Sequence, residues 1–150
     1  MHEIEFTTPK EAVKIIPDGA RIGTVGFLLT GAPEELFLEL GNRFVETGAP
    51  KDLTLMWDSG PGDGGERGLN HLGHEGLVKK TIGGHYGLLP KLVDLVVDNK
   101  IEAYNFPQGV LAQMWRDMAA HKPRVVSHVG LETFVDPEYD GGKLNEITTE

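Results

Sequence analysis

Residues 18–33 read DGARIGTVGFLLTGAP, and this stretch decides how the first half of the chain is built. Its opening Asp-Gly pair is a turn signal, and the run 22–25 favours a β-strand. Gly26 and Gly31 follow the strand, and glycine lets a backbone approach another group closely. The stretch therefore predicts a strand that presents exposed backbone amides to a ligand at its carboxyl end.

The rest of the chain alternates between helical and extended patterns. Apolar spacing with Pro and Gly signals predicts helices over residues 8–16, 33–47, 90–99 and 108–121, and a short helical stretch within residues 69–80. Strands are predicted over residues 21–25, 53–57, 78–82, 101–104 and 124–129. The tail 138–150 is polar and contains no predicted core element.

This alternation predicts the fold class. The strand at 53–57 is apolar on both faces, which suits a parallel sheet that is covered on both sides. We therefore expect an α/β fold with an open, mainly parallel sheet flanked by helices, and with binding loops at the carboxyl ends of the strands. Because the polar tail adds nothing that closes the sheet, we expect the chain to be part of a larger sheet.

The composition limits the function classes. The chain has 150 residues, of which 39% are apolar, so it is long enough to bury a core, and its length predicts one domain. Its 23 acidic residues outnumber its 14 Lys and Arg, and the net charge of -9 argues against a nucleic-acid binder, because phosphate contacts need clustered positive charge. The lack of cysteine excludes disulfides, thiolate catalysis and cysteine-based zinc sites.

The sequence also lacks the signals of membrane targeting. Met1 is followed by polar and acidic residues rather than by a basic and then apolar segment. No apolar run approaches the length that is needed to span a bilayer. A soluble, cytoplasmic protein without membrane association is therefore expected.

The segment 60–65 reads GPGDGG and has the spacing of a dinucleotide-binding fingerprint after a predicted strand. Asp63 and Glu66 would repel a pyrophosphate, and Pro61 lacks an amide donor. No helix plainly begins among these glycines to direct its dipole at an anion. The segment is better interpreted as a flexible or substrate-lining loop than as an NAD site.

His71, His74, Glu75 and His85 have the composition of a metal site. Their order differs from the His-Glu-x-x-His arrangement of zinc hydrolases, and no further carboxylate stands at a suitable interval. Structural roles, such as capping turns or bonding backbone, are favoured, and no metal is expected. A Gly-x-Ser-x-Gly nucleophile elbow is also lacking.

Residues 105–109 read NFPQG, directly after a predicted strand and at the start of a predicted helix. Gln108 offers two donors and one acceptor at a position where ligands bind in α/β folds. The pattern alone favours a plain turn shaped by Pro107 over a binding loop.

The core GFLLTGAP at residues 26–33 resembles the first signature of family I CoA-transferases. The runs 67–79, 83–87, 99–105 and 130–137 resemble the propionate, or short-chain acyl, CoA-transferase branch of that family. The likeness covers residues from about 8 to 148. The chain departs from the pattern at Val25, where many members have glycine, and at Leu131-Glu132, where a small, glycine-containing pair is usual.

The resemblance implies a ping-pong transfer of CoA between carboxylates, as in the metabolism of short-chain fatty acids and ketone bodies. In the family, a glutamate attacks the acyl-CoA and forms first an anhydride and then a glutamyl-CoA thioester. That glutamate lies in the second half of a longer chain, within a motif that is missing here. No glutamate of this chain is therefore nominated as nucleophile, and the catalytic residue stays unknown.

By the same resemblance, the substrate-binding residues are Gly26, Phe27 and Gly31 beside the acyl pocket, and Gln108 with Gly109 in the family's glutamine loop. The loop 59–65 is a weaker candidate for the same wall. Coenzyme A is a substrate, and no other cofactor is implied.

The family fold pairs two similar α/β domains of three layers across the active site. Residues 1–150 are expected to form the amino-terminal part of the first domain, and the second domain, with its nucleophile, lies outside them. The implied partners are an acyl-CoA, a short carboxylic acid such as acetate, propionate, butyrate or a 3-keto acid, and the rest of the chain or a second subunit in a homo-oligomer.

Two other functions share the expected fold. A non-catalytic binding or assembly module would retain the sheet without the chemistry. A sugar-phosphate isomerase or deaminase would need a positively lined phosphate loop, and the acidic segment 59–68 argues against one.

Overall fold

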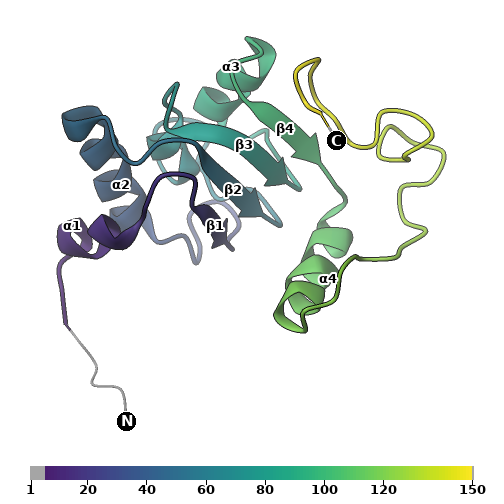
Figure 1. Cartoon of the computed structure of the whole chain (residues 1–150), viewed down its shortest axis with the longest axis horizontal. Helices are drawn as coiled ribbons and strands as arrows, with labels where there is room; N and C mark the ends of the chain where they lie inside the picture. Colours follow the sequence, from purple (N-terminus) through teal and green to yellow (C-terminus); the bar gives the residue numbers. More distant parts are fainter. Residues whose placement is uncertain (1–5, 150) are drawn as a thin grey trace.

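The computed structural model describes residues 6–149. Its centre is a parallel sheet of four strands in the order β1-β2-β3-β4 (Figure 1). The strands are β1 (Arg21–Thr24), β2 (Leu53–Trp57), β3 (Val78–Gly83) and β4 (Glu102–Asn105). This arrangement confirms the predicted α/β fold with a parallel sheet.

Several helices begin or end at the Pro and Gly residues that flank the apolar patterns in the sequence. They are α1 (Pro9–Ala12), η1 (Val13–Ile15), α2 (Glu34–Thr47), η2 (Leu69–Leu72), α3 (Pro90–Val97) and α4 (Gln108–Ala119). The Thr8 hydroxyl caps α1 by accepting from the Glu11 amide at 3.3 Å. Gly48 ends α2 in the left-handed region, with φ 70°. Within residues 6–149, no helix combines the length and the apolar character that a bilayer crossing requires.

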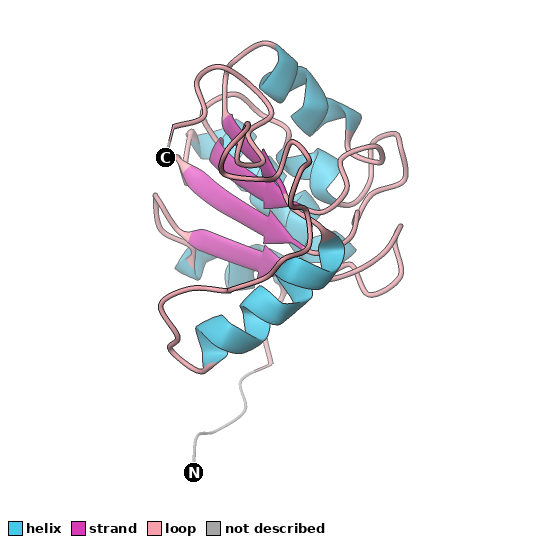
Figure 2. Cartoon of the chain, turned by 90° about the vertical axis from the view of Figure 1, so that its right-hand side faces the viewer, coloured by secondary structure: helices cyan, strands magenta, loops and turns pink. Residues whose placement is uncertain are grey.

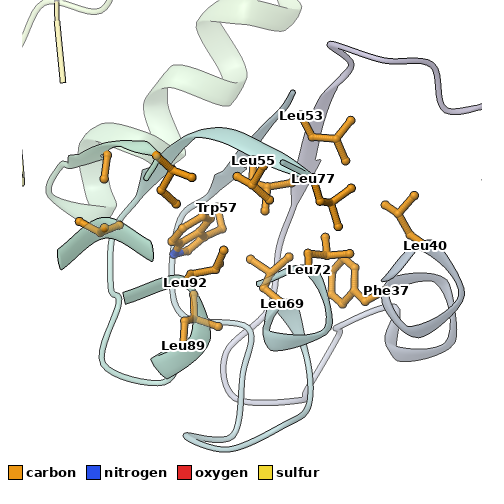
Figure 3. Close-up of a cluster of buried hydrophobic side chains, with 14 of the residues drawn as sticks. Phe37, Leu40, Leu53, Leu55, Trp57, Leu69, Leu72, Leu77, Leu89 and Leu92 are labelled. Atoms are coloured by element: carbon orange, nitrogen blue, oxygen red, sulfur yellow. The ribbon is translucent and has the colours of Figure 1, made fainter. Parts of the chain in front are cut away.

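The core lies on one face of the sheet. Leu53, Leu55 and Trp57 alternate along β2 and belong to one buried cluster with Phe37 and Leu40 of α2 (Figure 3). Leucines from η2, from α3 and from the loops complete the cluster; they are Leu69, Leu72, Leu77, Leu89 and Leu92. Burial of each large apolar side chain contributes about 1.5–3 kcal/mol, so this face stabilises the domain.

Trp57 needs a glycine beside it. Its side chain is fully buried, and a Cβ at Gly83 would lie 2.2 Å from the indole Cε2 atom. The indole Nε1 donates to the His85 carbonyl at 3.1 Å. The Tyr86 ring meets the indole edge-on, with ring centroids 4.9 Å apart. Gly83 therefore allows the largest core side chain to lie flat against the neighbouring strand.

The opposite face of the sheet is more polar, and α4 crosses it (Figure 2). Trp115 of α4 packs on β1, where a Cβ at Gly23 would lie 2.8 Å from the indole ring. Farther along this face, Lys80 pairs with Glu102 at 2.8 Å and lies 5.6 Å from the centre of the Tyr104 ring. α2 and α3 therefore cover one face of the sheet, whereas α4 crosses only part of the other, where Thr54, Met56 and Ile82 line a cavity of about 440 Å³ beside Met118.

The strand predicted over residues 124–129 is wrong. These residues form no strand, and the side chain of Val126 is 90% exposed. Arg124 and Val125 line a cavity of about 340 Å³ against Met114 and Met118 of α4. The segment lies beside α4 and away from the sheet. It therefore has no neighbouring strand with which its backbone could pair.

The polar tail, residues 138–149, lies along the edge of the sheet beside β4. This differs from the expectation that the tail adds no core element. The amide of Ala103 donates to the Thr148 hydroxyl at 2.8 Å, and Thr148 is only 4% exposed. The amide of Leu144 donates to the Ala103 carbonyl at 3.0 Å. Asn145 donates through Nδ2 to the Ile101 carbonyl at 2.9 Å. Polar side chains and backbone groups, rather than an apolar pattern, hold this segment.

Candidate functional site

The carboxyl ends of the four strands lie in register. Thr24 pairs with Trp57, Trp57 with Gly83, and Gly83 with Asn105. All four arrowheads point to the same side of the sheet (Figure 1). The loops that follow these strands therefore emerge at one edge, which is where ligands bind in open α/β sheets.

The turn 26–31 follows β1 at this edge. Its backbone closes on itself, because Phe27 and Thr30 exchange hydrogen bonds at 3.3 and 3.1 Å. Gly26 has φ 135° and Gly31 has φ 79°, which are conformations that favour glycine. Leu28 also has a positive φ of 55°, although it is a bulky residue. The turn leaves Phe27 59% and Leu28 45% exposed, so it presents apolar side chains at this edge of the sheet.

The glycine-rich loop, residues 59–68, lies directly beside this turn. The Leu28 amide donates to the Gly60 carbonyl at 3.1 Å, and Phe27 forms a parallel bridge with Gly60. A Cβ at Gly60 would lie 2.9 Å from the His85 ring, so a larger residue would push the loop away. The structure thus brings the turn together with the loop, whose residues 59–65 were, by the family resemblance, a weaker candidate for the same wall of the pocket.

Asn70 braces the glycine-rich loop from below. Its side chain is fully buried, and Nδ2 donates to the carbonyls of Arg67 at 2.9 Å and Leu88 at 3.0 Å. Its Oδ1 accepts from the Lys91 amide at 3.4 Å. The Leu88 carbonyl also accepts from the Gly64 amide at 3.1 Å. Asn70 was not identified as a site residue from the sequence. The one signal in the sequence was an amide side chain placed between the core residues Leu69 and Leu72.

Glu34 joins the first turn of α2 to the end of the glycine-rich loop. Its carboxylate accepts from the Gly68 amide at 2.8 Å and contacts His71 Nε2 at 2.9 Å, with Arg67 at 3.6 Å. Burial raises the pKa of Glu34, but the hydrogen bonds from His71 and Gly68 outweigh burial and lower the pKa overall. Sequence reasoning also missed this contact, because it joins residues that are more than 30 positions apart.

Gln108 and Gly109 open α4 at the same edge of the sheet, and both are exposed. Nothing lies within 4 Å of the position that a Gly109 Cβ would take. Asn105 fixes the approach to the helix by donating through Nδ2 to the carbonyls of Gly83 and Gly84 at 2.8 and 2.9 Å. The first amides of a helix lack carbonyl partners within it, and they carry a partial positive charge. This helix start can therefore receive a carbonyl oxygen or a carboxylate.

The glutamine position and the turn 26–31 are not in contact. The turn follows β1 and Gln108 follows β4, which are three strand spacings, or about 14 Å, apart. Within the described part of the chain, no hydrogen bond or ion pair links them. The structure therefore places them on one edge of the sheet but apart from each other.

The histidines occupy structural positions. His71 contacts Glu34, and the Glu75 carboxylate pairs with Lys100 at 3.2 Å instead of joining a histidine. Burial lowers the pKa of His74, and the charge of Lys91 lowers it further. In residues 6–149, no group of three or more acidic or histidine side chains is arranged to hold a metal ion.

Comparison with known proteins gives consistent matches along the chain. The model of the family described as coenzyme A transferase matches residues 6–149. The chain is 45% identical over 146 residues to caffeate CoA-transferase of Acetobacterium woodii, and this match spans 97% of the chain and 28% of that protein. It is 44% identical over 150 residues to acetate CoA-transferase YdiF of Escherichia coli O157:H7, with 98% of the chain and 28% of that protein covered.

The fold agrees with a solved structure. The crystal structure of the acyl-CoA transferase YdiF from Escherichia coli O157:H7, described as a thioester complex with CoA, superposes with a TM-score of 0.88 and 43% identity. The match covers 96% of this chain and 30% of the crystallised chain. The chain thus spans less than a third of the length of the relatives that it matches.

Proposed function

Because the chain belongs to the coenzyme A transferase family, we propose that it forms the amino-terminal part of the first domain of a CoA-transferase. The match over residues 6–149 confirms the family resemblance read from the sequence. The complete protein would move CoA from a short-chain acyl-CoA to a carboxylic acid. The rest of the polypeptide or a second subunit would supply the second domain, and the assembly would be a homo-oligomer.

The proposed reaction is a ping-pong exchange. A glutamate carboxylate from outside residues 1–150 attacks the thioester carbonyl, the C–S bond breaks, and the CoA thiolate leaves as an anhydride forms. The thiolate then attacks the glutamyl carbonyl, which gives glutamyl-CoA and releases the first carboxylate. The acceptor carboxylate then attacks glutamyl-CoA, and the same steps run in reverse. They yield the acyl-CoA of the acceptor and regenerate the glutamate. Covalent catalysis divides one difficult exchange into easier steps, and CoA enters as substrate.

In this proposal, the turn 26–31 forms the apolar wall of the acyl pocket. Gly26 and Gly31 hold the turn, and the exposed Phe27 and Leu28 face the acyl chain. Each buried methylene contributes only about 0.8 kcal/mol, so the wall would discriminate modestly between acetyl, propionyl and butyryl groups.

Gln108 and Gly109 form the polar wall. The Gln108 amide would donate to the carbonyl oxygen or orient the carboxylate, and the first amides of α4 would stabilise the negative charge that develops on that oxygen. The observation that carries the proposal is the common register of the strand ends, which places this helix start and the apolar turn on one edge.

The test is transfer of CoA from propionyl-CoA to acetate by the complete protein and by residues 1–150 alone. Q108A is compared with Q113A, a control on the same helix whose side chain bonds Asp117. Loss of one donor to a developing oxyanion costs about a hundredfold in rate, so Q108A should lose about that much kcat and Q113A little. Equal activity of the two variants would contradict the role of Gln108.

The isolated 150 residues are expected to be inactive, because the nucleophile is supplied from elsewhere. Transfer by the isolated chain would overturn that assignment. If the complete protein shows neither transfer nor heat of CoA binding in calorimetry, the chain is instead a non-catalytic binding or assembly module.

A further inference from the structure

The carboxylate of Glu34 uses both of its oxygens on the glycine-rich loop and on η2. Oε2 accepts from the Gly68 amide at 2.8 Å, and Oε1 lies 2.9 Å from His71 Nε2. Since a carboxylate can only accept, His71 must donate through a protonated Nε2. The side chains of Glu34 and His71 are only 27% and 18% exposed, so water competes weakly for these bonds.

Glu34 also lies close to the turn 26–31 in the chain, with only Ala32 and Pro33 between them. Its own amide donates to the Ala32 carbonyl at 2.9 Å, which ties the first residue of α2 to the residue that follows the turn. The start of α2, which carries the Glu34 side chain, is therefore held close to this turn.

The other partner, Gly68, is equally well connected within the loop. Gly68 forms an antiparallel bridge with Gly62, and the next amide, of Leu69, donates to the Pro61 carbonyl at 2.8 Å. A Cβ at Gly68 would lie 2.2 Å from the same Pro61 oxygen, so the two ends of the loop are pressed together. Gly68 is therefore connected to Gly60 through the contacts of only Pro61 and Gly62.

The turn and the loop are consequently joined at two points. One is the hydrogen bond from the Leu28 amide to the Gly60 carbonyl at 3.1 Å, and the other is the contact of Glu34 with Gly68 and His71. A single link would leave a hinge, whereas two links fix both the distance and the angle between the walls. The positive φ of Leu28 is the kind of strained conformation that persists only where its surroundings hold it in place.

We propose that Glu34 and His71 are positioning residues that clamp the apolar turn 26–31 against the glycine-rich loop and so hold the acyl pocket open to substrate. The effect on substrate rests on the proposed function, whereas the clamp itself is a property of the fold. Glu34 acts through the backbone of both walls and makes no direct contact with substrate in this proposal.

Amide hydrogen exchange of the complete protein tests the clamp without any assay of activity. E34Q removes the charge at nearly constant size, and E75Q removes an ion pair, with Lys100 at 3.2 Å, that is not tied to the loop backbone. A hydrogen bond to a charged group changes the equilibrium constant for local opening by about tenfold or more. E34Q should therefore speed amide exchange at Gly68 and at Leu28 by about tenfold. E75Q should change neither amide.

The two amides separate a clamp from a local contact. Faster exchange at Gly68 with unchanged exchange at Leu28 would overturn the proposal, because the two walls would then move independently. Unchanged exchange at both amides would overturn it as well. In a second pair, H71Q keeps an amide donor for Glu34 and should retain most of the protection that H71A loses.

Steady-state kinetics of the complete transferase test the consequence for substrate. E34Q should raise KM for propionyl-CoA about tenfold and change kcat by less than about threefold, since the walls shift while the reacting groups stay in place. Simple loss of folded enzyme would lower kcat and leave KM unchanged. An unchanged KM in an active E34Q enzyme would overturn the positioning role. If the complete protein lacks transferase activity, amide exchange still decides whether the clamp exists.

Discussion

Replacement of Asn70 by alanine should open the base of the glycine-rich loop. The wild-type side chain is fully buried and satisfies two carbonyl groups, of Arg67 and Leu88, and the amide of Lys91. N70A removes all three hydrogen bonds and leaves a small cavity.

The magnitude follows from these three bonds. Each buried polar group that loses its partner costs about 1–3 kcal/mol. The Leu88 carbonyl keeps the Gly64 amide at 3.1 Å, so its loss is partly offset, whereas the Lys91 bond at 3.4 Å is the longest of the three. We therefore expect N70A to cost about 3–5 kcal/mol, which is a large part of the 5–15 kcal/mol that stabilises a typical domain.

The assay is native-state amide exchange of the complete protein, which yields the free energy of local opening at Gly64 and at Lys91. N42A is the matched control, because Asn42 lies exposed on α2 and its replacement should stay within about 0.5 kcal/mol. If N70A lowers the opening free energy at these amides by less than about 1 kcal/mol, the bracing role assigned to Asn70 is refuted.

N70D gives an independent check through pH. Near neutral pH, its charged carboxylate faces two carbonyl oxygens and cannot donate, so N70D should be at least as unstable as N70A. As pH falls and the carboxyl becomes protonated, one hydrogen bond can re-form, and the stability gap between N70D and wild type should narrow. A gap that does not depend on pH would contradict the assigned donor role.

Three further perturbations test other parts of the structure. Because the pKa of Glu34 is lowered, its contribution to stability is fully present above the ordinary glutamate pKa and is lost as pH falls through the lowered value; urea unfolding should show the wild-type advantage over E34Q disappearing in acid. G83A places a Cβ against the indole of Trp57 and should destabilise the protein by about 1–3 kcal/mol, with a change in Trp57 fluorescence, and unchanged stability would show that the core adapts freely. T148V keeps the side-chain shape but leaves the buried Ala103 amide without its acceptor, so exchange at that amide should rise while exchange at the far edge, in β1, stays constant.

Local sequence features predicted most of the regular structure. Pro33 and Gly48 bound α2 close to the predicted limits, and the apolar residues on both faces of 53–57 predicted a strand that the structure contains. Such signals suffice where an element is decided by its own side chains, because backbone conformation and amphipathic spacing are properties of a few consecutive residues.

Two predictions for the second half of the chain were wrong: the strand at 124–129 and the polar tail without a core element. They have a common cause. Residues 124–129 are β-prone, yet they lie beside α4, and the sheet edge next to β4 is occupied by the polar tail through Thr148 and Asn145. A strand needs a neighbour with free backbone groups, and the pattern of one segment does not reveal which segment reaches that edge first.

For the candidate site, the sequence supplied the residue types and the tertiary structure supplied the contacts. The glycines of the turn 26–31 and Gln108 were identified from turn chemistry and family resemblance, and their roles toward substrate stay predictions. The brace at Asn70 and the contact of Glu34 with Gly68 and His71 emerged only from the folded chain.

The sequence by itself determined the α/β class, the family and the parallel strands at whose carboxyl ends ligands bind in such folds. Only the tertiary structure decided which side chains hold the walls of that site together, because Glu34 meets Gly68 and His71 across 34 and 37 positions of the chain. Periodicity and turn signals act over a few residues. Contacts at such separations depend on how α2 and the glycine-rich loop pack over one sheet, and that packing is a property of the whole fold.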